Sequence, residues 1–314
     1  LSFVHRNPTL DYIQANIEGL KKELRLAKEK TKGIIGVNIM VAMSNFADMV
    51  RTAIAEKADV IFSGAGLPLG LPGFLTPGSE TKLAPIVSSG RAAKLICTKW
   101  KETYNYLPDA IVVEGPKAGG HLGFKNNQIE DAHYSLEELV PEVVKEVKVF
   151  EDAYQVKIPV IAGGGIHTGS DMYNIMQKGA AGVQLGTRFV TTEECDASAG
   201  FKQSYLNASQ LDIEIIQSPV GMPGRAVHNS FIEEVNQGRR RPIKCPHHCI
   251  RTCDVSKTPY CIISALYNAY KGNMGKGFAF AGANAYLATK ITTVKEIFKE
   301  LVDDFQTAMN PAPI

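Results

Sequence analysis

The sequence predicts an α/β fold with a parallel sheet, either a TIM (β/α)8-type barrel or a doubly wound sheet. Short apolar runs alternate along the chain with segments of helix length, which is the pattern of parallel βαβ units. The clearest case is the stretch 158–190, which holds two apolar runs, 158–162 and 182–185. Each run leads into a glycine-containing turn and then into a helical pattern. Two consecutive strand, loop and helix units therefore lie side by side in the predicted sheet.

The turns after these two strands predict a binding site for a phosphate. Gly163, Gly164 and Gly165 follow the first strand, and Gly186 and Thr187 follow the second. Glycines lack a Cβ, so the backbone N–H groups at the start of the next helix can approach an anion closely. In (β/α)8 barrels the loops after the seventh and eighth strands commonly form a phosphate site. We therefore predict that these two loops hold one phosphate.

Composition indicates a soluble globular protein with a large core. The chain has 314 residues, 45% of them hydrophobic, and a net charge of +2. This small charge argues against a nucleic-acid or membrane-surface partner. No apolar run reaches the roughly 20 residues that span a bilayer. The chain shows no secretory signal and only six cysteines, so we expect a reducing, cytoplasmic compartment.

Periodicity and capping signals assign the elements in order. Apolar residues between positions 10 and 24 recur at steps of three and four, which predicts an amphipathic first helix. Capping boxes predict later helix starts at Ser135, Thr168 and Thr293. The expected strands are residues 34–40, 60–63, 84–88, 110–113, 158–162 and 182–185.

Six strands are two fewer than a closed barrel of this kind requires. If the phosphate loops follow the seventh and eighth strands, the two missing strands belong upstream. The first thirty residues form one predicted helix and cannot supply them. We expect that this chain begins inside the second strand-to-helix loop of a longer protein, and that the first two barrel strands are absent from it.

A second chemically informative stretch, EGPKAGGHLGF, covers residues 114–124 directly after a predicted strand. Catalytic groups of barrels usually lie at this end of the strands. Gly119 and Gly120 let the backbone pass close to a flat ligand, and His121 then offers an imidazole suited to acid or base chemistry. The alternative is a loop histidine with local hydrogen bonds only. Glu114 either contacts a ligand or accepts from nearby backbone N–H groups.

Four segments together resemble the nitronate monooxygenase family, also known as 2-nitropropane dioxygenases. They are GVNIM at 36–40, EGPKAGGHLG at 114–123, IPVIAGGGI at 158–166 and GVQLGTRF at 182–189. The resemblance extends from about residue 36 to residue 205. A flavin-dependent enoyl-acyl-carrier-protein reductase shares the family's fold and its GGH motif.

The resemblance implies FMN as the cofactor of a barrel enzyme. It implies that the cofactor's phosphate is held by Gly163, Gly164, Gly165, Gly186 and Thr187. It also implies positions near the ring or ribityl chain for Asn38, Met40, Gly119 and Gln184. His121 is implied to face the substrate above the flavin as the catalytic residue.

Three functions remain open at this stage. The first is a nitronate monooxygenase that oxidises a small alkyl nitronate with dioxygen to a carbonyl compound and nitrite. The second is a reductase that uses NAD(P)H and FMN to reduce an enoyl thioester or a quinone. The third is a non-catalytic flavin- or metal-binding interaction module. The sequence leaves the oligomeric state open, including a homodimer.

Residues 210–277 depart from the family pattern and form a predicted, mainly helical insert. We expect an FMN-binding barrel domain at 1–209, this insert, and a C-terminal segment at 278–314 whose helix packs back on the barrel. Four cysteines fall within seventeen residues of the insert, and thiolates are good ligands for zinc and iron–sulfur clusters. The candidate metal ligands are Cys245, Cys249, Cys253 and Cys261. The alternative is a group of reduced thiols without a metal.

Overall fold

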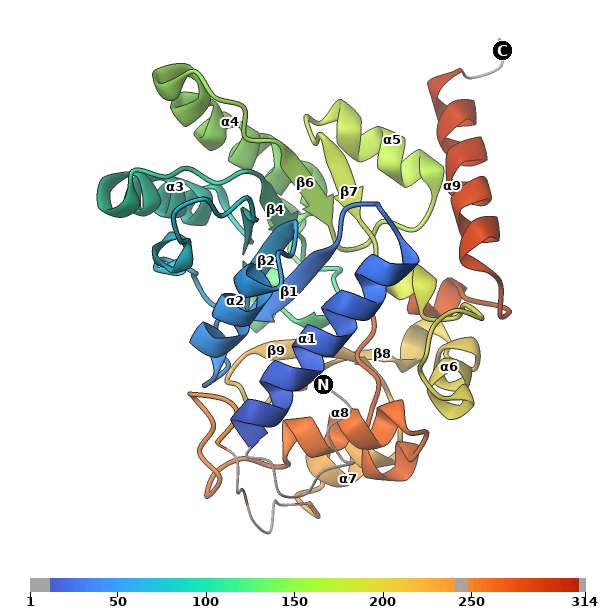
Figure 1. The fold of residues 1–314 in the computed structure, drawn as a ribbon. Helices are drawn as coiled ribbons and strands as arrows, with labels where there is room; N and C mark the ends of the chain where they lie inside the picture. Colours follow the sequence, from blue (N-terminus) through green and yellow to red (C-terminus); the bar gives the residue numbers. More distant parts are fainter. Residues whose placement is uncertain (1–11, 241–244, 246–247, 311–314) are drawn as a thin grey trace. The chain divides into compact units, whose positions relative to one another are not determined.

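The computed structural model describes residues 12–240, 245 and 248–310, and only these are discussed (Figure 1). The chain divides into two compact units. The first comprises Leu1–Val112, Lys145–Pro159 and Pro246–Arg251, and the second comprises Val113–Val144, Val160–Cys245 and Thr252–Ile314. Strand β4 (Ile111–Glu114) and helix α4 (Leu136–Tyr154) each run from one unit into the other.

The first unit contains three parallel strands and the helices that connect them. The elements in order are α1 (Tyr12–Lys30), β1 (Gly36–Met40), α2 (Phe46–Ala55), β2 (Val60–Gly64), β3 (Lys82–Val87) and α3 (Gly90–Tyr104). Strands β1 and β2 pair from Gly36 with Val60, and β2 and β3 pair from Val60 with Lys82. The start of β4 continues this sheet, because the Asp109 N–H donates to the carbonyl of Leu83 at 3.0 Å.

Apolar periodicity explains how the first unit is packed. Helix α1 packs against α2 and buries Ala15 and Leu24. Helix α3 begins where the Ser89 Oγ accepts from the Ala92 N–H, and it buries Trp100 completely. Parallel strands covered on both faces are typically apolar throughout, and the central strands here fit that rule. The first helix and the first strands that the sequence predicts are present in the structure.

The second unit contains two further parallel strands and the end of β4. Strand β6 (Val160–Gly163) pairs in parallel with β7 (Gly182–Gln184) from Ile161 with Gly182. The end of β4 reaches β6 through the Gly115 N–H, which donates to the Gly163 carbonyl at 2.9 Å. The resulting strand order is β1-β2-β3-β4-β6-β7. The six strands expected from the sequence are all present, and the fold is α/β with the strand and helix alternation of a TIM barrel.

The second unit also contains a small antiparallel sheet that the sequence did not predict. It consists of β5 (Gly120–His121), β9 (Pro223–Val227) and β8 (Ile213–Gln217), in this order. Strand β5 has two residues, and β9 begins with Pro223 and Gly224, residue types that are depleted in strands. Because of these features, the sequence shows no strand pattern from which this small sheet could be predicted. The pairing of His121 with Gly224 nevertheless fixes the histidine backbone.

The remaining helices belong to the second unit. They are α5 (Gly169–Gln177), α6 (Ala199–Leu206), α7 (Ser230–Asn236), α8 (Ile262–Tyr270) and α9 (Val294–Met309). The predicted capping boxes of α5 and α9 are present, with Thr168 and Asp171 at one and Thr293 and Glu296 at the other. Within the described part of the chain, every helix is too short or too polar to cross a membrane.

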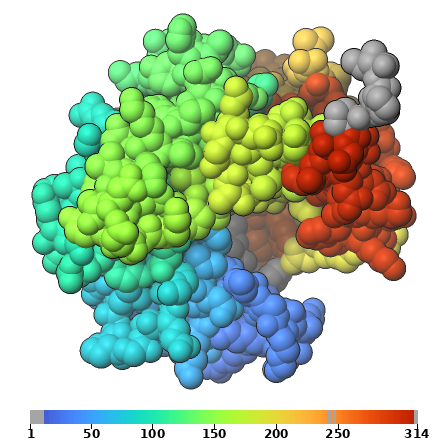
Figure 2. Space-filling view, turned by 90° about the horizontal axis from the view of Figure 1, so that it is seen from above, coloured from blue at the N-terminus to red at the C-terminus, as the bar shows by residue number. Residues whose placement is uncertain are grey.

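Helices α5 and α9 lie side by side in the second unit, as the yellow-green and red surfaces in Figure 2 show. Gly169 makes their close approach possible, because a Cβ at this position would lie 2.1 Å from the carbonyl oxygen of Leu301. The C-terminal helix is thus anchored beside the loop that follows β6. The predicted domain limits at 209/210 and 277/278 stay a prediction.

Candidate functional site

The two glycine loops line one cavity of about 400 Å³ in the second unit. Its wall includes Gly164, Gly165, Ile166 and His167 after β6, and Gln184, Leu185, Gly186 and Thr187 at β7. The segment after β4, with Glu114, Gly119 and Gly120, and the segment 280–284 complete the wall. The cavity therefore lies at the carboxyl ends of β4, β6 and β7, where open α/β sheets bind ligands.

The loop after β6 needs glycine for steric reasons. Gly164 has a φ of +96°, and a Cβ there would lie 2.9 Å from the Gly115 carbonyl oxygen. Gly165 has a φ of +87°, and its Cβ would meet the Lys117 side chain at 2.8 Å. Any other residue would strain the backbone and collide with the loop after β4. The glycines thus hold two cavity walls close together.

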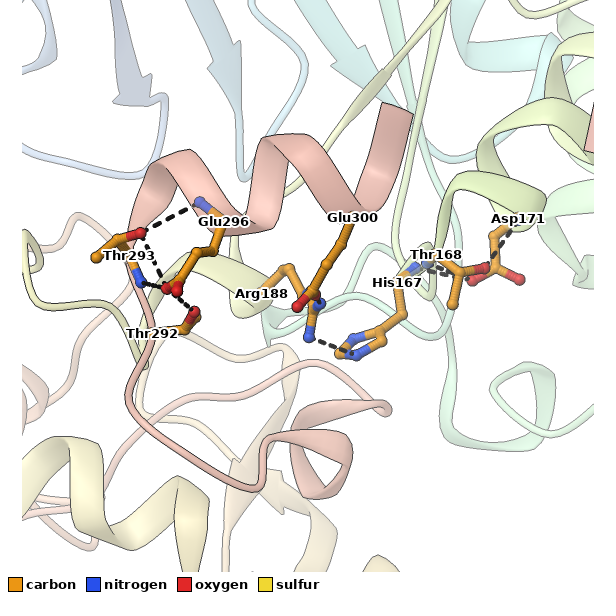
Figure 3. Close-up of polar contacts among 8 residues, drawn as sticks. All are labelled: His167, Thr168, Asp171, Arg188, Thr292, Thr293, Glu296 and Glu300. Carbon is orange, nitrogen blue, oxygen red and sulfur yellow. Dashed lines mark hydrogen bonds and ion pairs between the residues drawn. The ribbon is translucent and has the colours of Figure 1, made fainter. Parts of the chain in front are cut away.

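Helix α5 starts directly behind this loop. The Asp171 carboxylate accepts from the backbone N–H groups of His167 and Thr168, both at 2.9 Å, and the Thr168 Oγ1 accepts from the Asp171 N–H (Figure 3). This capping box fixes the direction in which the loop enters the helix. The start of a helix carries positive potential, so it suits an anion in the adjacent cavity.

Gly119 also stands where no side chain fits. A Cβ at Gly119 would lie 2.6 Å from the backbone of Ala281 and Gly282. The Gly282 N–H donates to the Thr187 Oγ1 at 3.0 Å, which ties this segment to the loop after β7. Because the Thr187 oxygen already accepts this bond, its hydroxyl proton can donate to a ligand oxygen.

His121 is held from two sides on β5. Its Nε2 lies 2.6 Å from the Ser218 Oγ, and its ring meets the Phe280 ring edge-on with centroids 4.9 Å apart. Burial lowers the pKa of His121 to about 4, so the imidazole is neutral near pH 7. A neutral imidazole can accept a proton or donate one N–H.

Glu114, at the end of β4, is a titratable group in the cavity wall. Burial raises the pKa of Glu114 to about 7. The carboxyl group is therefore partly protonated near neutral pH and can then donate a hydrogen bond. The sequence identified Glu114 as a candidate but did not decide between a ligand and backbone N–H groups as its partner.

Sequence reading missed Ser218, His167, Arg188 and Phe280. Ser218 lies in the β8–β9 turn, 97 positions from the histidine that it contacts, and no local pattern links the two. His167 and Arg188 stand next to the predicted phosphate loops, and the Arg188 Nη1 lies 3.2 Å from the His167 Nε2 (Figure 3). The sequence feature that could have indicated His167 and Arg188 is their position beside the two glycine turns.

Six of the residues assigned to the cofactor by resemblance come together in this cavity. They are Gly119, Gly164, Gly165, Gln184, Gly186 and Thr187. Gly163 directly precedes the loop, and its Cβ would lie 3.5 Å from the Cβ of Gln184. Asn38 and Met40 lie on β1 in the first unit, and their roles stay a prediction.

The four candidate metal ligands do not all belong to one unit. Cys245, Cys253 and Cys261 lie in the second unit, whereas Cys249 lies buried in the first. Burial, followed by the charges of the Cys245 and Cys261 thiols, raises the pKa of Cys253.

The geometry gives the metal site no support. Across the described residues, no three side chains of His, Cys, Asp or Glu are arranged to hold a metal ion. The site therefore stays a prediction. Metal analysis of protein purified without oxygen tests it, and protein that folds stably without bound zinc or iron would exclude it.

Fold and cavity define an α/β-barrel type of protein with its candidate site at the carboxyl ends of the parallel strands. A sequence model of the nitronate monooxygenase family matches residues 7–304, so the chain belongs to this family. A probable nitronate monooxygenase of Staphylococcus aureus (strain Newman) is 36% identical over 130 residues, which cover 41% of this chain and 34% of the relative. The match thus spans about a third of the length of these curated relatives.

Two solved structures share the fold over nearly the whole chain. FabK from Thermotoga maritima is 26% identical with a TM-score of 0.73, and the alignment covers 96% of this chain and 84% of FabK. A nitroalkane oxidase from Streptomyces ansochromogenes is 18% identical with a TM-score of 0.71, covering 93% and 86% of the two chains. The second likeness concerns the fold alone.

Proposed function

We propose that this protein is an FMN-dependent oxidoreductase that oxidises alkyl nitronates with dioxygen to a carbonyl compound and nitrite. The observation that carries the proposal is the single cavity shared by both glycine loops and by Gly119 and Gly120. His121 directly follows this glycine pair. Gly119 and Gly120 therefore connect the titratable imidazole of His121 to the cavity in which the glycine loops would hold a phosphate.

The residues of the cavity fit a flavin mononucleotide. A Cβ at Gly186 would find no heavy atom within 4 Å, so the backbone of this loop borders open space in which a phosphate oxygen can sit. Gly163, Gly164, Gly165, Gly186 and Thr187 would hold the phosphate through backbone N–H groups and one hydroxyl. Gln184 and Gly119 would lie near the ring or ribityl chain, and the same role for Asn38 and Met40 stays a prediction.

His121 would handle the proton next to the reacting group. When bound, FMN supplies the electron-transfer chemistry, and the protein binds and orients the reactants. Because burial keeps His121 neutral, it can take the proton beside the nitro group of a neutral nitroalkane. Toward a nitronate anion, which has already lost that proton, the same ring would donate a hydrogen bond to a nitro oxygen.

A second candidate is an NAD(P)H-dependent FMN reductase of enoyl-acyl-carrier-protein or quinones. The likeness to FabK over 96% of this chain favours it. In that reaction His121 would supply the proton that accompanies hydride transfer. A small-molecule substrate is common to both candidates, whereas dioxygen belongs to the first and NAD(P)H to the second. A cytoplasmic location and a homodimer stay predictions.

The decisive experiment compares two assays on the flavin-loaded full chain. Oxygen uptake with propyl-2-nitronate supports the monooxygenase, and NAD(P)H oxidation that requires an enoyl thioester or a quinone supports the reductase. His121→Ala should slow the supported reaction at least tenfold and leave the FMN dissociation constant within twofold, because phosphate grip and proton handling lie on different loops. Full activity of this variant on every substrate would refute the role of the imidazole.

A further inference from the structure

A chain of three polar side chains leads from helix α9 to the cavity wall. Glu300 on α9 forms an ion pair with the Arg188 Nη2, and the Arg188 Nη1 lies 3.2 Å from the His167 Nε2 (Figure 3). His167 lines the cavity directly after the glycine loop and is 9% exposed. The mechanism proposed above uses none of these three residues.

The contact with Arg188 determines the tautomer of His167. A guanidinium group has only donors, so the Nε2 of His167 must accept. Burial, followed by the charge of Arg188, lowers the pKa of His167, although Asp171 and Glu300 act in the opposite direction. The ring is therefore neutral at pH 7 and carries its proton on Nδ1, which is left as the donor of the ring.

Neighbouring residues hold the Arg188 side chain in position. Its side chain is only 20% exposed, and its buried Nε atom has no hydrogen-bond partner among the described residues. Glu300 holds one edge of the guanidinium, and α9 itself is fixed by its capping box and by its close packing against α5 at Gly169. A cation is thus kept next to the loop that contains Gly186 and Thr187.

The other charges around His167 leave room for an anion. The Asp171 carboxylate is already engaged by the N–H groups of His167 and Thr168. Glu300 is paired with Arg188, and Glu114, which also lines the cavity, is partly protonated near pH 7. The glycine loops and His167 therefore line the cavity, and the Arg188 guanidinium contacts His167 next to it.

We propose that Glu300, Arg188 and His167 form a positioning chain that recognises the phosphate monoester of the flavin and so selects FMN over riboflavin. His167 donates through Nδ1 to the phosphate end, Arg188 orients this ring and supplies positive charge, and Glu300 orients Arg188. The inference rests on the flavin chemistry proposed above. It makes the C-terminal helix part of the cofactor site, although α9 contributes no residue to the cavity wall.

Flavin binding separates this role from a purely structural one. Flavin-stripped protein is titrated with FMN and, separately, with riboflavin, and quenching of flavin fluorescence gives both dissociation constants. Arg188→Met removes every donor at similar volume and should raise the FMN dissociation constant about tenfold, while the riboflavin value stays within twofold. Glu300→Gln should act in the same direction by about threefold.

Asp303→Asn is the matched control, because Asp303 is also an exposed carboxylate on α9 but pairs with Lys299 of the same helix. It should change neither constant. Labelling the histidines with ¹⁵N adds a direct readout: His167 should give the Nδ1–H pattern in the wild type and in Asp303→Asn, and a tautomer mixture in Arg188→Met. Should Arg188→Met fail to fold, Glu300→Gln decides, since its side chain is about half exposed.

Two outcomes would overturn this inference alone, and a third would overturn the proposed function as well. Equal losses of FMN and riboflavin affinity in Arg188→Met and Glu300→Gln would reveal a general effect on folding. Equal affinity of the wild type for both flavins would show that the phosphate is not recognised, while the flavin function would stand. Binding of neither flavin by the wild type would overturn the proposed function together with this inference.

Discussion

The Oγ of Ser218 and the Nε2 of His121 lie 2.6 Å apart, although 97 positions separate the two residues. The Val220 N–H approaches the same oxygen at 3.4 Å. The Ser218 hydroxyl can donate to Nε2, which places the histidine proton on Nδ1 for donation to a ligand, or accept from Nε2, which leaves Nδ1 free to take a proton. Ser218 is therefore a positioning residue for His121.

Ser218→Ala should slow turnover about fivefold, because the loss of one hydrogen bond to a buried ring costs about 1 kcal/mol. The His121 ring can then adopt either neutral tautomer. The FMN dissociation constant should stay within twofold. Steady-state kinetics, flavin titration and ¹⁵N spectra of the histidines measure these effects. Ser204→Ala, whose hydroxyl donates to the Phe201 carbonyl within α6, serves as the control. An unchanged kcat with an unchanged His121 tautomer would contradict the assignment.

Glu114 and His121 make opposite contributions to the pH dependence of stability. Burial raises the pKa of Glu114 to about 7, so the folded state binds more protons than the unfolded state from about pH 4.5 to 7. Stability from this group falls as the pH rises through that window. Burial lowers the pKa of His121 to about 4, so its contribution rises with pH between about 4 and 6.5.

Glu114→Gln should isolate the first contribution. Between pH 5 and pH 8 the variant should lose less free energy of unfolding than the wild type, by on the order of 2 kcal/mol. The His121 contribution is common to both proteins and cancels in the comparison. Urea unfolding of flavin-free protein at the two pH values gives the difference. Parallel curves for wild type and variant would mean that Glu114 titrates normally.

Two glycine substitutions should separate ligand binding from folding. Gly186→Ala places a methyl group in open space, so the free energy of unfolding should change by less than about 0.5 kcal/mol. The same methyl group occupies space assigned to the phosphate, and FMN affinity should fall at least tenfold. Flavin titration and urea unfolding measure the two quantities.

Gly119→Ala should behave in the opposite way. Its Cβ would lie 2.6 Å from the backbone of Ala281 and Gly282, so the loop must shift and the protein should lose about 2 kcal/mol or more of stability. If Gly186→Ala binds FMN as tightly as the wild type, the loop after β7 does not border the phosphate.

The parts of the site that the sequence predicted are local in the chain. The glycine turns after β6 and β7, the capping box at Thr168 and the positions of the six parallel strands all follow from neighbouring residues. The contacts that complete the site join distant residues. Glu300 stands 112 positions from Arg188, and Ser218 lies in the turn between β8 and β9, where β9 starts with Pro223. Periodicity reports which face of an element is buried, but it does not report which distant element covers that face.

Trp100 fixes the glycine- and proline-rich segment 64–78 of the first unit. The side chain is completely buried in α3, and its Nε1 donates to the Pro68 carbonyl at 3.0 Å. Trp100→Phe keeps an aromatic ring but removes this donor and part of the volume. Because the Pro68 carbonyl then keeps only the Leu71 N–H as a donor and a cavity remains, we expect a loss of about 2 kcal/mol in the free energy of unfolding.

Tyr104→Phe is the matched control for this prediction, since Tyr104 lies on the same helix with 38% of its surface exposed. It should change the free energy of unfolding by less than about 0.5 kcal/mol. Limited proteolysis should cut within residues 64–78 faster in Trp100→Phe than in Tyr104→Phe, because only the first loses the bond to Pro68. Equal cleavage rates in the two variants would show that the indole N–H does not hold the segment, and that the helix secures it through apolar contacts alone.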